Sequence, residues 1–129
     1  MIALDTNVLV RYFVRDDPRQ FGRAAKLLES ELTGVDPGFV SLVTLCELVW
    51  VLQDAYGFEP ARIAEAIHFL LETRQIEVEN DRVVAKALTS GHRDIADAII
   101  HFLGEAYGCE RTVTFDRRFA RLPGVELLG

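Results

Sequence analysis

The sequence alternates between short apolar runs of strand length and longer segments with helical periodicity. The runs of strand length are residues 2–4, 39–40, 76–78, 112–114 and 125–127, and we expect residues 2–4 to form a buried first strand. A chain that returns through a helix after each strand pairs its strands in parallel and covers both faces of the sheet. We therefore expect an α/β fold, namely a three-layer α/β/α sandwich with a central, mostly parallel sheet of about five strands.

Turn and capping signals set the expected helix boundaries. Asp17-Pro18 has the pattern of an N-cap followed by proline at the first helical position, and Pro60 opens another helix in the same way. Gly91 and Gly108 are typical helix terminators. The sequence predicts helices over residues 7–14, from 18, around Glu47, from 60, from 81 to about 91, over 94–107 and over 117–122.

Length and composition limit the kinds of protein that this chain can be. Its 129 residues suit one domain, and no linker, repeat or low-complexity tract interrupts them, so we expect residues 1–129 to form a single domain. A net charge of −6 argues against a protein that grips nucleic acid by bulk charge. No run is long enough to span a membrane, and Met1–Leu4 lacks a basic region, so we expect a cytoplasmic protein.

A carboxylate interrupts the most apolar segment of the chain. Glu47 lies within SLVTLCELVWVL, residues 41–52, with Val43, Trp50 and Val51 one turn away. A helix that is apolar all round is normally buried, and a buried ionised carboxylate is costly unless it is paired or bound to a cation. We expect Glu47 to be buried beside such a partner. The alternatives are a salt bridge with an arginine or a helix turned so that Glu47 reaches solvent.

Three aspartates add to this signal. Asp5 and Asp116 each follow a predicted strand, which is where ligands gather in parallel sheets. Asp97 lies three residues after Asp94, and both share a helix face with His101. Each of these aspartates could instead cap a helix, and for Asp94 and Asp116 alone the capping interpretation is the better one.

Taken together, the four positions predict a cation site. If Asp5, Glu47, Asp97 and Asp116 converge, their charges require neutralisation. Oxygen ligands without cysteine or histidine suit Mg²⁺ or Mn²⁺, whereas a zinc site is not indicated because the histidines are scattered. The chain has no P-loop, GxGxxG, CxxC or HExxH motif.

Four segments, taken in order, resemble one family over nearly the whole chain. They are IALDTNVLVRYF, SLVTLCELVWVL, DIADAIIHFLGEAYGC and TVTFDRRFARLPGVELL. They resemble the PIN-domain family, and within it the VapC-type ribonuclease toxins of bacterial toxin–antitoxin pairs. The resemblance implies an α/β/α sandwich and a metal-dependent endoribonuclease, usually a homodimer, that a cognate VapB-like antitoxin inhibits. Its acidic quartet maps onto Asp5, Glu47, Asp97 and Asp116.

The resemblance also implies supporting residues and a mechanism. The supporting polar residues map onto Thr6 or Asn7 and onto Thr114, while Asp94 could be a ligand, a helper or a cap. We expect one or two Mg²⁺ or Mn²⁺ ions to activate a water that hydrolyses an RNA phosphodiester bond. Arginines near the site could contact the RNA, although a solvated surface is the simpler interpretation for each: Arg11, Arg15, Arg117 and Arg118.

Two other functions fit parts of the pattern. A phosphoaspartyl enzyme or receiver domain also places an aspartate after the first strand, but it needs a lysine near the phosphate, and neither Lys26 nor Lys86 follows a predicted strand. A non-catalytic module would use the acidic residues as helix caps and its apolar faces to bind a partner.

Overall fold

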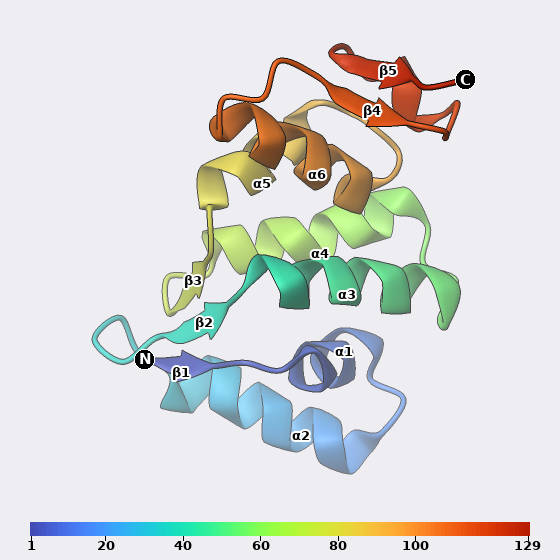
Figure 1. Cartoon of the computed structure of the whole chain (residues 1–129). Coiled ribbons are helices and arrows are strands. Elements are labelled where there is room, and N and C mark those ends of the chain that lie inside the picture. The colour runs from blue at the N-terminus through green and yellow to red at the C-terminus, as the bar shows by residue number, and fades with distance from the viewer. The chain divides into compact units, whose positions relative to one another are not determined.

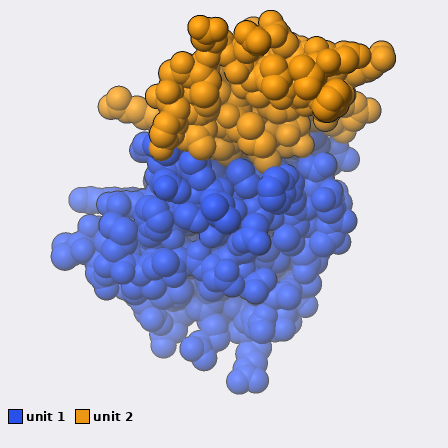
Figure 2. Space-filling model, viewed as in Figure 1, with its two compact units in different colours: residues 1–81 blue, residues 82–129 orange.

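The computed structural model describes residues 1–129, and these form two compact units. The first unit comprises residues 1–81 and the second residues 82–129 (Figure 2). None of the helices is long and apolar enough to cross a membrane.

The first unit is built on a parallel sheet of three strands (Figure 1). The strand order is β1 (Ile2–Ala3), β2 (Gly38–Val40) and β3 (Ile76–Val78), so β2 is central. In this register Gly38 lies opposite Ile2 on one side and Ile76 on the other. The helices of this unit are α1 (Thr6–Val14), α2 (Pro18–Lys26), α3 (Leu42–Asp54) and α4 (Pro60–Glu72), and α2 continues as a π-helical turn (Leu27–Glu31).

Local capping explains where two of these helices begin. The Asp17 side chain accepts a hydrogen bond from the backbone N–H of Gln20 at 3.0 Å, and Pro18 occupies the first helical position of α2. Ser41 caps α3 by accepting from the Thr44 amide at 3.1 Å.

The core of the first unit lies between the sheet and its helices. Its fully buried side chains come from α1, β2, α3 and α4, and include Leu9, Val40, Leu45, Leu48, Leu52, Ile67 and Leu70. The prediction of a buried first strand is wrong, because both residues of β1 are exposed. This strand is at the edge of its sheet, where one side of the backbone has no neighbouring strand.

The second unit combines two helices with a parallel pair of strands (Figure 1). It contains α5 (Asp81–Thr89, whose first residue ends the first unit), α6 (Ile95–Ala106), β4 (Thr112–Thr114) and β5 (Val125–Leu127). A single 3₁₀ turn, Phe119–Arg121, lies between the two strands. Gly124 precedes β5 with a φ of +89°, and an added Cβ there would lie 2.9 Å from the His101 ring.

The predicted fold class is confirmed. The chain is a mixed α/β protein with five strands, and every strand pair is parallel. Hydrogen bonds group these strands as a sheet of three and a sheet of two. The helix predicted over residues 117–122 is wrong in kind, because only a short 3₁₀ turn forms where Asp116 and the following backbone make a tight turn.

Gly38 provides a test of packing at the centre of the first sheet. A Cβ at this position would lie 2.8 Å from Leu32 Cδ1 and 2.9 Å from Leu4 Cδ1, and both leucines are buried. We expect Gly38→Ala to lower the free energy of unfolding by about 1–3 kcal/mol through overpacking. Gly34→Ala is the matched control, because a Cβ at Gly34 meets no atom within 4 Å. Urea unfolding of both variants measures this, and equal stabilities would contradict the packing argument.

Candidate active site

Asp5 lies just after β1, as the sequence predicts for a ligand at the end of a strand. It stands at the N-cap position of α1 with extended backbone angles, but its side chain makes no capping hydrogen bond. The carboxylate is exposed and accepts a long hydrogen bond from Asn7 Nδ2, at 3.4 Å from Oδ2. The capping interpretation of Asp5 is therefore not what the structure shows, and the carboxylate is accessible to a ligand.

Thr6 links the start of α1 to α3. Its Oγ1 donates a hydrogen bond to Glu47 Oε1 at 2.8 Å, and its side chain is buried while Glu47 is exposed. A short bond to an ionised acceptor is among the stronger hydrogen bonds in proteins. It holds one oxygen of Glu47 beside the residue that follows Asp5, so the first unit presents Asp5, Thr6, Asn7 and Glu47 together.

The prediction that Glu47 is buried is wrong. The Glu47 side chain is exposed, as are Val43 (73% exposed) and Trp50 (48%), which lie one turn away on the same helix. The buried face of α3 is formed instead by Leu45, Leu48, Val49 and Leu52. Although α3 is apolar on nearly all sides, it is not buried on all sides, because only one of its faces packs against the core.

Asp94 and Asp97 occupy the first turn of α6 in the second unit. Asp94 is the N-cap, and its Oδ1 accepts from the Asp97 amide at 3.1 Å. This is the capping role that the sequence favours for Asp94. This bond involves only the backbone of Asp97, so the half-buried Asp97 side chain makes no hydrogen bond to Asp94.

The charge state of Asp97 reflects its acidic surroundings. Burial raises the pKa of Asp97 to about 6, with further upward contributions from the negative charges of Asp94 and Asp116. The positive charge of His92 acts in the opposite direction and lowers this pKa. The carboxylates of Asp94, before α6, and Asp116, after β4, therefore both lie close enough to Asp97 to repel its charge.

Asp116 is held rigidly by the backbone around it. Its amide donates to Thr114 Oγ1 at 3.0 Å, and its Oδ1 accepts from the amides of Arg118 (2.8 Å) and Phe119 (3.3 Å). The side chain thus caps the tight turn after β4, in line with the capping interpretation, while its second oxygen accepts no hydrogen bond. Asp116 is exposed, so capping and ligand binding use different oxygens of the same carboxylate.

The structure places two histidines in surroundings that the sequence does not predict. The scattered histidines of the sequence do not indicate a shared site, but in the structure His92 lies near Asp97, and its ring is 5.9 Å from the Phe119 ring. The only signal for it in the sequence is its place two residues before Asp94. His101 shares a helix face with the aspartates in sequence, but it is buried and its Nδ1 lies 2.8 Å from Thr112 Oγ1. This places His101 in the packing of α6 against β4.

The arginines predicted to contact substrate fall into two classes. Arg11 is paired with Asp16 at 2.7 Å, and the guanidinium of Arg15 lies 4.6 Å from the centre of the Phe21 ring. Arg117 and Arg118 are both exposed beside Asp116. The structure therefore gives Arg11 and Arg15 partners within the first unit.

Oxygen atoms of carboxylates are the kind of donor that suits a hard divalent cation. Asp5 and Glu47 lie in the first unit, and Asp97 and Asp116 in the second, with oxygen as the only donor element. No group of three or more His, Cys, Asp or Glu side chains in the structure is arranged to hold a metal ion. The repulsion around Asp97 nevertheless marks a place where a cation would be favourable.

Comparison with known proteins identifies a family. The family model described as PIN domain matches residues 2–125, which is nearly the whole chain and includes all four carboxylates. A comparison with curated proteins finds no match.

The pKa of Asp97 can be measured in the metal-free protein. We expect its side-chain carboxyl to titrate near pH 6 by ¹³C NMR. Asp94→Asn should lower this pKa, because asparagine retains the cap but removes a negative charge. Asp54→Asn, at an exposed carboxylate near the end of α3, serves as the control and should leave the Asp97 titration unchanged. A normal aspartate titration in the wild-type protein would contradict the clustering.

The raised pKa also makes a prediction about stability. The unfolded-state pKa of Asp97 is 3.8 and the folded value is about 6, so the native state binds more protons between these pH values. The Asp97 contribution to the free energy of unfolding therefore falls as pH rises from about 4 to 6. We expect Asp97→Asn to gain about 1–2 kcal/mol relative to wild type between pH 4 and pH 7. Urea unfolding at both pH values measures the gain, and a difference that does not vary with pH would contradict it.

Proposed function

The chain belongs to the PIN-domain family, and from this premise we propose that it is a Mg²⁺- or Mn²⁺-dependent endoribonuclease. PIN domains are generally metal-dependent nucleases. The observation that carries the proposal for this chain is the placement of Asp97 near Asp94 and Asp116, where burial first, and then the charges of these two carboxylates, raise the pKa of Asp97. A bound divalent cation would offset such repulsion, and metal-dependent hydrolysis of phosphodiesters uses such a cation.

We assign metal binding to the four carboxylates of the acidic quartet. Each of Asp5, Glu47, Asp97 and Asp116 is a proposed ligand of the ion or ions, and the single domain over residues 1–129 stays a prediction. The oxygen-only donor set suits Mg²⁺ or Mn²⁺. A cation bound there would favour ionisation of a water and offset charge that develops on the phosphate during hydrolysis.

The neighbouring side chains hold these carboxylates in position. Thr6 fixes one oxygen of Glu47, and Asn7 donates to Asp5. Thr114 and two backbone amides orient Asp116 so that its second oxygen stays available. Groups that orient ligands in this way matter to activity almost as much as the ligands, because they remove the entropy cost of arranging the site.

Arginines would contact the RNA backbone. Arg117 and Arg118 are exposed and follow Asp116 directly, which suits contact with a phosphate next to the cleaved bond. Arg11 and Arg15 make local interactions and would contribute less, since Arg11 would have to exchange its Asp16 partner for phosphate.

We further propose that the chain is the toxin of a VapBC-type pair, inhibited by a cognate antitoxin. The four quoted segments support this subtype. A hollow of about 240 Å³ between α1 and α4 supports a protein partner, because it is lined by Tyr12, Phe13, Phe58 and Phe69 and flanked by arginines. Aromatic side chains near arginine are typical of surfaces that bind peptides or proteins.

A homodimer is also part of the proposal. Val43 and Trp50 are exposed apolar side chains two turns apart on α3, and exposed apolar patches mark interaction surfaces. Light scattering of the purified chain measures its mass directly, and a monomer at micromolar concentration would count against the dimer.

Substitution of the quartet tests the nuclease. We expect Asp5→Asn and Asp97→Asn to lower cleavage of single-stranded RNA by roughly 100-fold or more. Thr6→Val should lower it by roughly 10–100-fold, because Glu47 loses the group that orients it. Asp54→Asn is the control and should keep wild-type activity. Circular dichroism shows whether each variant is folded, and full activity in folded Asp97→Asn would overturn the assignment.

Metal binding can be tested without any RNA. We expect Mn²⁺ or Mg²⁺ to raise the melting temperature progressively, with about 2.7 kcal/mol of added stability at 100 times the dissociation constant. Asp97→Asn should lose most of this gain, whereas Asp54→Asn should retain it. A melting temperature that does not respond to either ion would favour the non-catalytic role, in which the aspartates only cap helices.

A further inference from the structure

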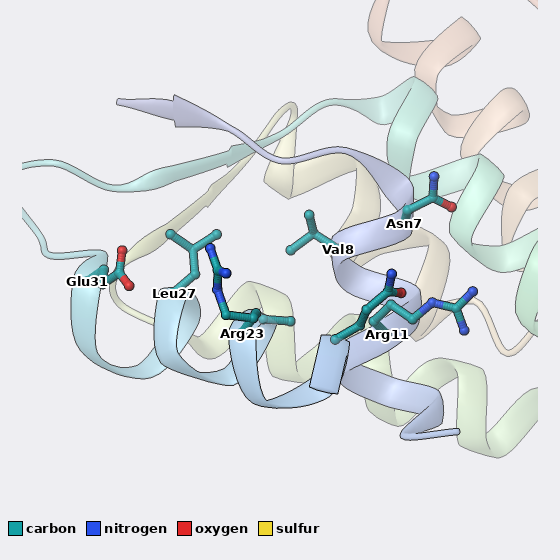
Figure 3. A pocket seen from close by; sticks show the side chains of 8 residues that line it. Asn7, Val8, Arg11, Arg23, Leu27 and Glu31 are labelled. Atoms are coloured by element: carbon teal, nitrogen blue, oxygen red, sulfur yellow. The ribbon is translucent and has the colours of Figure 1, made fainter. Parts of the chain in front are cut away.

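A hollow of about 380 Å³ lies between α1 and α2 in the first unit (Figure 3). This volume is within the range of roughly 300–1,000 Å³ that small-molecule sites occupy. It begins at Asn7, whose Nδ2 contacts Asp5, and it extends along α2 to Glu31 in the π-helical turn. Asn7 therefore belongs both to the lining of the hollow and to the surroundings of the Asp5 carboxylate in the proposed active site.

The lining of the hollow combines apolar side chains, side-chain amides and charged groups. Val8, Ala24 and Leu27 supply apolar surface, and Figure 3 shows Val8 pointing from α1 toward the space bordered by Arg23 and Leu27. Asn7 and Gln20 carry side-chain amides, which donate and accept hydrogen bonds at once. This mixture of apolar surface and a few polar groups is typical of pockets that bind a flat polar molecule.

The two arginines of the hollow differ in their freedom to bind an anion. Arg11 is engaged by Asp16 at 2.7 Å. Arg23 is exposed and makes no ion pair in the structure. The remaining charge is Glu31, which Figure 3 places at the opposite end of the hollow from Asn7 and Arg11. An incoming phosphate therefore meets an unpaired guanidinium at Arg23 and is kept from the Glu31 end by repulsion.

We infer that this hollow is a subsite for one nucleotide of single-stranded RNA, next to the bond that is cut. Its phosphate is held by Arg23, its base lies against Val8 and Leu27, and the amides of Asn7 and Gln20 meet the polar edge of the base. Single-stranded RNA suits this geometry, because an unpaired base is free to leave its neighbours and enter a pocket. The inference rests on the proposed nuclease function for the identity of the ligand.

The test compares two arginines of the same helix. Arg23→Gln removes the phosphate contact, and Arg19→Gln removes the same charge from an exposed residue of α2 outside the hollow. Binding of a fluorescently labelled single-stranded oligoribonucleotide is followed by anisotropy in an Asp97→Asn background, so that the RNA stays intact. We expect Arg23→Gln to weaken binding about tenfold and Arg19→Gln less than twofold.

Salt dependence separates a specific phosphate contact from bulk charge. Each phosphate contact with a single strand contributes about 0.7 to the slope of log K against log salt concentration. Arg23→Gln should reduce that slope by about 0.7, and Arg19→Gln should leave it unchanged. Leu27→Ala should weaken binding with no change of slope, since it removes apolar contact alone.

Cleavage kinetics provide a second readout. In the otherwise wild-type chain, Arg23→Gln should raise KM with kcat within about twofold, as expected for a contact made equally before and during reaction. If RNA is cleaved but Arg23→Gln and Arg19→Gln behave alike in binding and KM, the subsite is overturned while the nuclease stands. If the oligoribonucleotide binds with the Arg23 dependence but the wild-type chain cleaves no RNA, the subsite holds and the nuclease proposal fails.

Discussion

Repulsion between carboxylates is the constraint around which the site is arranged. The second unit brings Asp94, Asp97 and Asp116 near one another, and the pKa of Asp97 rises to about 6 as a result of burial and of these charges. Such an arrangement lowers stability in the absence of a counter-charge. Strongly perturbed pKa values of this kind are common at functional sites, where a bound ligand can offset the repulsion. The protein uses backbone hydrogen bonds to keep the cluster in place. Asp94 is fixed as a helix cap and Asp116 as the cap of a turn.

Capping and ligand binding turn out to be compatible in this chain. For Asp94 and Asp116 the sequence suggested a choice between the two roles, but the Asp116 side chain caps through Oδ1 and leaves Oδ2 without a hydrogen bond. The cap then serves to orient the free oxygen. Asp5 differs, because it occupies an N-cap position without capping, and its exposed carboxylate accepts only a long hydrogen bond from Asn7.

The first helix connects the acidic site to the proposed nucleotide subsite. Asp5, Thr6 and Asn7 are consecutive: Asp5 is exposed, Thr6 donates to Glu47, and Asn7 lines the hollow between α1 and α2 and contacts Asp5. If the proposed nuclease function holds, the start of α1 would position the substrate relative to Asp5, because sites built on helices are more precise than sites on loops. The chain's net charge of −6 then makes local arginines, Arg23 above all, the means by which RNA would be held.

The sequence by itself determined the α/β class, the five parallel strands and most helix limits, because periodicity, proline and capping residues act within a few positions of one another. The acidic quartet, which the sequence also suggested, stays a prediction. Only the tertiary structure decided that Glu47 is exposed, that β1 is an edge strand with both residues exposed, and that His92 lies near Asp97 while His101 is buried. These properties depend on which face of a helix meets the core and on which strand lies beside which. The contacts that bury a helix face or pair two strands join residues far apart in the chain, and the spacing of residues within one segment does not predict them.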